Sequence, residues 1–257
     1  MQREENYRIR CAWMLKMKTT KIEWTDRTWN PITGCNKASD GCVNCYAWNM
    51  SMRLQRMGQE KYKNGFKVTT HISCLDEPLH WKNSSNIFVC SMSDLFNENV
   101  PFTFIDKVMN IIEKASWHRF QILTKRAERM SEYFASHPVP SNAWIGVTVE
   151  SDKYKNRIDC LRTIPAKIRF LSCEPLLNDL GELNLKEIHW VIVGGESGPK
   201  ARPMQKKWVE SIQKQVKKQG AHFFFKQWGT WGEDGTRRNK KQNGKLLNGK
   251  IYQSMPK

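Results

Sequence analysis

The sequence has 257 residues, of which 39% are hydrophobic and 11% aromatic, so it is neither a disordered chain nor too short to bury a substantial core. Lysine and arginine outnumber aspartate and glutamate by 42 to 25, a formal net charge of +17. Such a basic chain is expected to bind a nucleic acid or a nucleotide, because lysine and arginine release the counterions that surround phosphates. The sequence contains no run of about 18 apolar residues, so no membrane span is predicted.

Residues 1–17 are expected to be an N-terminal extension outside the folded domain. They carry charges, but they lack the apolar core and the small-residue cleavage site of a secretory signal peptide. We therefore expect a cytoplasmic protein whose eight cysteines stay reduced. In a reducing compartment, clustered cysteines indicate metal ligands or catalysts before they indicate disulfides.

Short apolar runs alternate with longer amphipathic segments along the chain, as is typical of a parallel sheet with crossover helices. Near-continuous apolar runs, such as those at 87–90 and 223–225, predict strands that are buried on both faces. Strands are predicted at residues 28–33, 67–73, 87–91, 120–124, 144–149, 168–172, 190–193 and 223–226. Helices are predicted at residues 45–57, 102–112, 127–134, 152–161 and 208–216.

These elements predict an α/β fold, a TIM-like (β/α) barrel of eight strands that spans residues 18–235. Six strands with additional elements is the alternative. Residues 236–257 are expected to form a basic C-terminal tail, either a solvated and partly disordered end or an arm that contacts phosphates. Its candidates for phosphate contacts are Arg237, Arg238, Lys240 and Lys241.

Polar residues follow nearly every predicted strand, and the active site of a (β/α) barrel lies at that end of the strands. The candidates are Asp94 and His71 for proton transfer, Lys125 and Lys226 for phosphate or carboxylate, and Glu150, Glu174 and Glu196 for orienting a cofactor or substrate. Of these, the candidate catalytic residues are Asp94, His71, Lys125 and Glu174.

The loop of residues 34–46 carries three closely spaced cysteines, Cys35, Cys42 and Cys45. Three thiolates can hold three irons of a [4Fe–4S] cluster, whose fourth iron then stays open to a small molecule. Zinc is one alternative, with a fourth ligand from outside the loop. Three free thiols without a metal is the other.

A glycine pair follows the strand predicted at 190–193, in the run Gly194, Gly195, Glu196 and Ser197. Glycines at such a place let a ligand approach the backbone and reach its N–H groups. The glutamate could then bind an ammonium group or a ribose hydroxyl. An ordinary turn between a strand and a helix has the same composition, so both interpretations remain open.

Several long motifs resemble those of the phage-type three-cysteine-motif proteins, a family of phages and bacteria. These motifs lie at residues 20–35, 41–46, 91–96, 120–126, 170–177, 193–198 and 225–229, and the resemblance spans about residues 18–257. The family is similar to the radical S-adenosylmethionine (SAM) enzymes. This resemblance implies a radical-SAM-like fold, a [4Fe–4S] cluster on Cys35, Cys42 and Cys45, and SAM bound at the open iron, where an electron cleaves it to a deoxyadenosyl radical.

The resemblance also implies contacts to SAM or substrate from Tyr46, beside the last cysteine, and from the loop of residues 194–197. Three features differ from the common superfamily pattern. Six residues separate Cys35 from Cys42, where three is usual, and the aromatic Tyr46 follows the last cysteine instead of preceding it. The Gly-Gly-Glu run also lies late in the chain, so the pose of SAM stays open.

The leading hypothesis is a radical-SAM-like iron–sulfur enzyme that modifies or repairs a nucleic-acid base or a nucleotide, in a bacterium or in the host cell of a phage. It would need an electron donor, and a partner protein is a further expectation. Two alternatives remain: a zinc-stabilised nucleic-acid-binding protein without catalysis, and a metal-dependent barrel hydrolase or nuclease.

Overall fold

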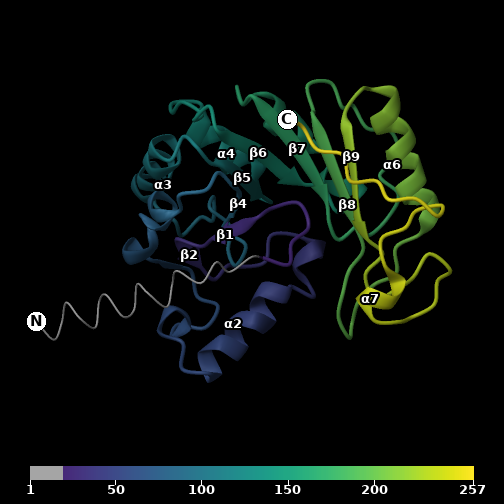
Figure 1. Ribbon diagram of the computed structural model, residues 1–257, viewed down its shortest axis with the longest axis horizontal. Helices are drawn as coiled ribbons and strands as arrows, with labels where there is room; N and C mark the ends of the chain where they lie inside the picture. Colours follow the sequence, from purple (N-terminus) through teal and green to yellow (C-terminus); the bar gives the residue numbers. More distant parts are fainter. Residues whose placement is uncertain (1–19) are drawn as a thin grey trace, which may run out of the picture.

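The computed structural model describes residues 20–257, and its centre is a seven-stranded parallel sheet (Figure 1). The strands lie in the order β1-β4-β5-β6-β7-β8-β9. Their bounds are β1 (Arg27–Trp29), β4 (Asn86–Val89), β5 (Arg119–Thr124), β6 (Ala143–Thr148), β7 (Ile168–Cys173), β8 (Trp190–Gly194) and β9 (His222–Gln227). Every neighbouring pair is parallel, so all the carboxyl ends meet at one edge.

The sheet curls into a half-barrel and does not close, so the prediction of a closed eight-stranded barrel is wrong. The missing member is the strand predicted at 67–73. Only Thr69–Thr70 is extended there, as β3, and it pairs antiparallel with β2 (Ile32–Thr33) in a separate two-stranded sheet. Its segment has only two apolar residues, Val68 and Ile72, too few for a strand that is buried on both faces.

The predicted helices are present at or near their expected positions. The α-helices of the described residues are α2 (Tyr46–Arg56), α3 (Phe102–Lys114), α4 (Ala127–Phe134), α5 (Asn156–Arg162), α6 (Lys206–Lys218) and α7 (Lys240–Asn243). Short 3₁₀ turns are η1 (Asp40–Cys42), η2 (Glu60–Tyr62), η3 (Ile72–Cys74), η4 (Glu77–His80) and η5 (Asp152–Tyr154). The helix predicted at 152–161 is therefore divided into η5 and α5.

The two faces of the sheet pack against different partners. The outer face shares one large apolar core with helices α3 to α6, through side chains such as Val108, Met130 and Val209. The inner face carries a second cluster, mostly aromatic, near the amino ends of the strands. Its buried members are Trp24, Phe88, Trp144, Ile168, Phe170, Trp190, Ile192 and Phe224. This aromatic plug fills the amino end of the half-barrel and leaves the carboxyl end for polar residues.

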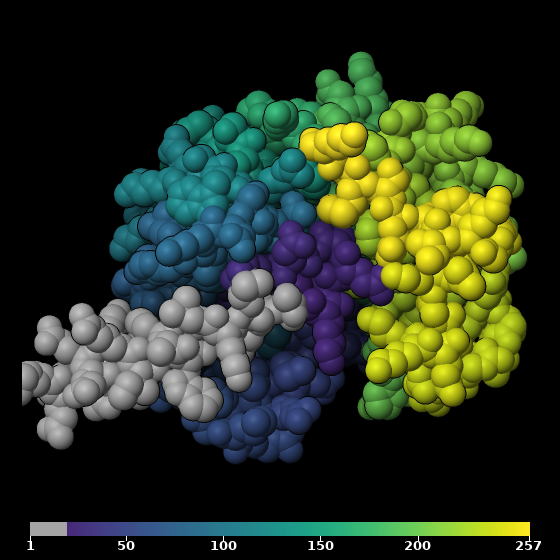
Figure 2. Space-filling view, viewed as in Figure 1, coloured from purple at the N-terminus to yellow at the C-terminus, as the bar shows by residue number. Residues whose placement is uncertain are grey.

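The basic segment of residues 236–257 is attached to the half-barrel although much of it is exposed. The N–H of Phe225 in β9 donates to the Tyr252 carbonyl at 2.7 Å, so the segment runs along the free edge of β9. The Lys245 ammonium lies 2.7 Å from the Glu23 carboxylate, which precedes β1. In Figure 2 these yellow residues accordingly lie against purple ones. The segment thus spans the gap between the two edge strands that a closed barrel would have joined.

All seven strands of the sheet lie within the predicted domain of residues 18–235. The expected N-terminal extension, residues 1–17, lies outside the residues that the structure describes. Within residues 20–257, no helix combines the length and the apolar character that crossing a membrane requires.

Candidate metal centre at the open end of the half-barrel

Alternation along the strands directs polar side chains into the open carboxyl end. On β7, Phe170 belongs to the aromatic plug, and Ser172 and then Glu174 follow at every second residue, on the same side. On β9, Phe224 is followed in the same way by Lys226. The Lys226 Nζ and Glu174 Oε1 atoms lie 2.9 Å apart, so residues from two strands meet inside the half-barrel.

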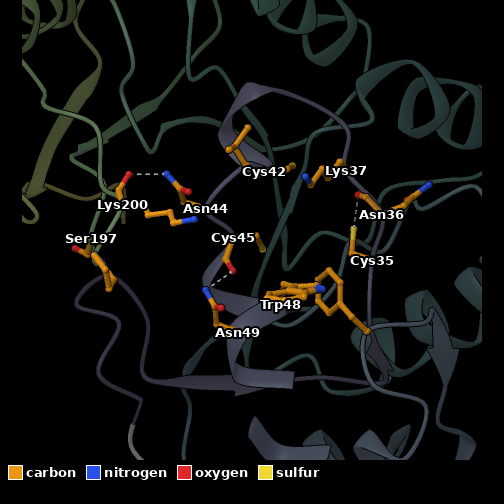
Figure 3. A pocket seen from close by; sticks show the side chains of 14 residues that line it. Cys35, Asn36, Lys37, Cys42, Asn44, Cys45, Trp48, Asn49, Ser197 and Lys200 are labelled. Carbon is orange, nitrogen blue, oxygen red and sulfur yellow. Dashed lines mark hydrogen bonds between the residues drawn. The ribbon is translucent and has the colours of Figure 1, made fainter. Parts of the chain in front are cut away.

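The loop of residues 34–46 carries the three predicted metal ligands. The Cys35 N–H donates to the Phe66 carbonyl at 3.1 Å, which fixes the start of the loop. Cys42 ends the turn η1, and Cys45 is the N-cap residue of α2. All three thiols are half-exposed and line one cavity of about 780 Å³ (Figure 3). The fold therefore gathers the three cysteines around a single space.

Two polar side chains from the sheet side approach the Cys35 sulfur. The Asn97 Nδ2 and the Arg126 Nη1 atoms each lie 3.7 Å from Cys35 Sγ. Burial raises the pKa of the Cys35 thiol to about 11, the Asp94 carboxylate acts in the same direction, and the Arg126 guanidinium opposes both. A metal would displace this proton, and the two donors would then stabilise the negative charge on sulfur.

Asp94 is a buried carboxylate that accepts several hydrogen bonds. It accepts from the Thr124 hydroxyl at 2.6 Å, the Lys125 N–H at 3.1 Å and Arg126 Nη1 at 3.1 Å. Arg126 in turn donates to the Asn36 carbonyl at 3.2 Å. Asp94 therefore holds Arg126 against the cysteine loop, and these contacts are those of a positioning residue.

Glu150 fixes the middle of the same loop. It is completely buried, and its Oε2 atom lies 2.9 Å from Arg157 Nη1. Its Oε1 atom accepts hydrogen bonds from the Ser39 hydroxyl and from the Gly41 N–H, the latter at 3.3 Å. The carboxylate thus joins the loop to α5, and its oxygens are already in use.

Glu196 fixes the end of the loop in a similar way. Its Oε2 atom accepts from Asn44 Nδ2 at 3.1 Å, and its Oε1 atom accepts from Arg202 Nη2 at 2.6 Å. Arg202 also donates to the Asp40 carbonyl at 3.0 Å. Burial alone would raise the pKa of Glu196, but the hydrogen bonds from Arg202 and Asn44 hold it below its usual value.

The space beside each glycine of the pair after β8 is occupied by the protein itself. A Cβ atom on Gly194 would lie 2.7 Å from Glu174 Oε1, and one on Gly195 would collide with the Trp228 carbonyl. The Gly195 N–H donates to the Gln227 carbonyl at 3.0 Å, so it is not free for a ligand. These contacts favour the interpretation that the two glycines form an ordinary turn and do not bind a ligand. Ser197, two residues after Gly195, does line the cavity.

Glu174 and Lys226 form a polar pair at the open carboxyl end of the half-barrel, which we call the mouth. Partial burial and the neighbouring Lys226 ammonium lower the pKa of Lys240, which places this residue of the basic segment close to the pair. Tyr46, the first residue of α2, donates its hydroxyl to the Ser91 carbonyl and is 58% exposed. Among the predicted residues, Glu174, Lys226, Lys240 and Tyr46 therefore surround the mouth.

His71 is not at the end of a barrel strand, so its predicted place on the rim is wrong. It follows β3 in the small antiparallel sheet, where its Nε2 atom lies 2.7 Å from Thr33 Oγ1, and it does not line the cavity. Among the basic residues of the C-terminal segment, Arg238 pairs with Asp234 at 2.6 Å. Arg237 donates to the Pro199 carbonyl, and Lys241 is exposed on α7.

The donor set fits an iron–sulfur cluster. Within residues 20–257, no three histidine, cysteine, aspartate or glutamate side chains are grouped as ligands of a single metal ion. A [4Fe–4S] cluster does not need such a group, because each thiolate binds a different iron. Cys35, Cys42 and Cys45 around one cavity, with N–H donors at the Cys35 sulfur, are residues that could hold it.

The fold and the site together define an α/β half-barrel protein with a cysteine loop over its carboxyl end. The sequence profile of DUF5131, described as "Protein of unknown function", matches residues 19–256, so the chain belongs to this family. No curated protein matches the chain.

Among solved structures, spore photoproduct lyase complexed with dinucleoside spore photoproduct superposes with a TM-score of 0.50. The sequence identity is 12%, and the match covers 79% of this chain and 64% of that chain. A cysteine-to-serine variant of the same lyase gives the same values. The chain therefore spans less than two thirds of the length of these structures, and what it shares with them is the fold.

Several residues at the site have contacts that the sequence alone did not assign. Arg126 follows the strand predicted at 120–124 but received no function from the sequence, and Arg157 and Arg202 were not predicted at all. Each donates to a predicted carboxylate, respectively Asp94, Glu150 and Glu196. A buried carboxylate needs a cation nearby, so a search for arginines shortly after each rim carboxylate could have found Arg157 and Arg202.

Proposed function

We propose that the protein is a radical-SAM-type iron–sulfur enzyme that acts on a base of a nucleic acid or on a nucleotide. The observation that carries this proposal is the cavity lined by Cys35, Cys42 and Cys45 at the carboxyl end of the half-barrel. The motif resemblance of the cysteine loop supports the cluster and SAM. The net charge of +17 and the shared fold with a lyase that was solved with a dinucleoside photoproduct support a nucleic-acid substrate.

In this proposal, Cys35, Cys42 and Cys45 would hold the cluster, which would supply the electron for cleavage of SAM. The chain's own residues bind, orient and exclude water. Arg126 stabilises the negative charge at Cys35, while Glu150 and Glu196 keep the loop in place. Glu174 and Lys226 in the mouth, together with Lys125 after β5, then bind and orient SAM or the substrate.

The first test is the metal and sulfide content of protein purified without oxygen. We expect a brown protein with broad absorbance near ~400 nm and iron and acid-labile sulfide in about equal amounts. Cys42→Ala should remove the colour. The matched control is Cys160→Ala, because Cys160 is also a half-exposed thiol but lies on α5 and does not line the cavity.

The second test measures whether the protein cleaves SAM. Protein that carries the cluster should release deoxyadenosine when dithionite and SAM are added. A colourless protein with bound zinc would refute the proposal in favour of a nucleic-acid-binding protein without catalysis. Metal-dependent cleavage of DNA or RNA without SAM would refute it in favour of a hydrolase or nuclease.

A further inference from the structure

The cavity beside the cysteines has an aromatic wall that the cluster does not need. Trp48 of α2 and Phe66 both line it, and Figure 3 shows the Trp48 ring at the cavity. Trp48 is 51% exposed, although a tryptophan side chain of a protein domain is usually mostly buried. A flat, exposed indole at the entrance to a cavity is suited to stacking against another flat ring.

Apart from the three cysteines, the charged side chains that line this cavity are all positive. Lys37 and Lys200 line it from opposite sides in Figure 3, one from the cysteine loop and one from the loop after β8. No aspartate or glutamate belongs to its lining. Within residues 20–257, neither lysine side chain is in an ion pair with a carboxylate, so both ammonium groups can accept an anion from solution.

Three asparagines, Asn36, Asn44 and Asn49, complete the lining, and the Oδ1 atom of Asn36 already accepts a hydrogen bond from Arg126. Asn44 Nδ2 donates to Glu196 at 3.1 Å and to the Lys200 carbonyl at 2.8 Å, and Asn49 Nδ2 donates to the Cys45 carbonyl at 3.4 Å. Asn44 uses both of its N–H groups and Asn49 uses one of its two, so the two amide oxygens and one N–H group of Asn49 are left to a ligand. An amide oxygen accepts a hydrogen bond, which suits the amino or imino groups on the edge of a base.

We propose that this cavity receives one nucleotide extruded from a nucleic-acid strand. Its base stacks on Trp48 and Phe66, and the phosphates before and after it lie at Lys37 and Lys200. Two lysines on opposite sides match a nucleotide with a phosphate on each side, whereas a free mononucleotide could use only one of them. This inference rests on the proposed function and narrows its substrate to a base within a strand, because chemistry on a base requires it to leave the stack.

The test measures binding, without reductant, to the anaerobically purified protein, whatever its iron content. A fluorescently labelled single-stranded oligonucleotide is followed by anisotropy, with a mononucleotide as competitor. Trp48→Leu should weaken oligonucleotide binding about tenfold, the usual effect of removing one stacking aromatic. The matched control is Trp117→Leu, since Trp117 is 41% exposed but lies just before β5, at the amino end of the sheet.

The lysines are tested through the salt dependence of the same binding. Lys37→Ala and Lys200→Ala should each reduce the slope of log affinity against log salt by about 0.7, the value for one phosphate contact on a single strand. Lys167→Ala, at an exposed lysine before β7, is the control and should leave the slope unchanged.

Three results would overturn the inference. One is an equal effect of Trp48→Leu and Trp117→Leu, and another is a mononucleotide that competes as strongly as the oligonucleotide. The third is a Trp48→Leu variant that loses SAM binding but keeps full oligonucleotide binding, since the aromatic wall would then serve the adenine of SAM. Failure of the proposed function has a different signature, because missing iron or missing deoxyadenosine leaves the binding measurements intact.

Discussion

The inward-facing side chains of the sheet differ in kind between the two ends of the same strands. Trp190 near the start of β8 belongs to the aromatic plug, and Glu196 just beyond its end holds the cysteine loop. Phe170 and Glu174 show the same change along β7. Side chains alternate along a strand with a period of two, so these residues lie on the same face of the sheet. One strand therefore provides an apolar side chain for stability at its amino end and a polar side chain for the site at its carboxyl end.

The carboxyl end itself contains two kinds of glutamate. Glu150 and Glu196 accept hydrogen bonds from the cysteine loop and from an arginine each, so they hold the loop in place. Glu174 pairs with Lys226 in the mouth and does not contact the loop. The difference separates residues that build the site from residues that are available to a ligand.

Trp190→Ala should have the largest effect on stability. The Trp190 side chain is fully buried and its ring lies 5.6 to 6.1 Å from four aromatic neighbours in the plug. Removing it leaves a cavity and should lower the free energy of unfolding by about 3–5 kcal/mol, measured by urea denaturation. Trp117→Ala, at a partly exposed tryptophan, should cost less than about 1 kcal/mol. Equal costs would show that the plug does not stabilise the amino end.

Glu150→Gln should lower both stability and iron content. It leaves the Arg157 guanidinium, whose side chain is 5% exposed, without its charge partner, which should cost about 3 kcal/mol in urea denaturation. It also weakens the hydrogen bonds that hold Ser39 and Gly41, so less iron should be retained after anaerobic purification. A destabilised variant that keeps its full iron content would show that Glu150 is not needed to hold the cysteine loop in place.

The contrast between the two ends explains what the sequence could predict. Six of the eight predicted strands lie in the sheet at about their predicted positions, because apolar runs such as 87–90 and 223–225 must be buried wherever they pair. The strand predicted at 28–33 is divided, since Thr28 and Trp29 belong to β1 whereas Ile32 and Thr33 form β2 in the small antiparallel sheet. The strand predicted at 67–73 is not in the sheet, because its two apolar residues are too few for burial on both faces, and β1 pairs directly with β4 instead. Residues 236–257 lie between the two edge strands β1 and β9, and their composition gives no indication of it.

At the carboxyl end, the sequence predicted the carboxylates but not their functions. Glu150, Glu174 and Glu196 follow strands, so parallel topology alone brings them to one edge. Which of them stays available to a ligand depends on partners such as Arg157, Arg202 and Lys226, and these contacts form only when helices and loops are in place. Sequence periodicity does not encode such pairings.

Glu174→Gln should change activity while the site stays assembled. The Lys226 and Glu174 side chains are 20% and 14% exposed, so losing this partly solvated pair should cost only about 1 kcal/mol in urea denaturation. Iron content should equal that of the wild type, whereas deoxyadenosine release should fall roughly 10- to 100-fold if Glu174 orients SAM or substrate. An unchanged rate would mean that the mouth pair is structural, like Glu150 and Glu196.

His71→Gln should have the smallest effect, and only on the pH dependence of stability. Burial, with the nearby Lys61 ammonium, lowers the pKa of His71 to about 4 in the folded protein, compared with about 6.5 when unfolded. Below pH ~6.5 the unfolded chain therefore binds a proton that the folded protein does not, so this contribution is complete above that pH and is lost as the pH falls toward 4.

Between pH 7 and pH 5 the wild type should lose on the order of 1–2 kcal/mol through this histidine, and His71→Gln should lose that much less in urea denaturation. Its iron content and deoxyadenosine release should match the wild type, because the His71 ring contacts Thr33 of β2 and does not line the cavity of the three cysteines. Loss of activity in the variant would instead support the prediction from the sequence that His71 transfers a proton.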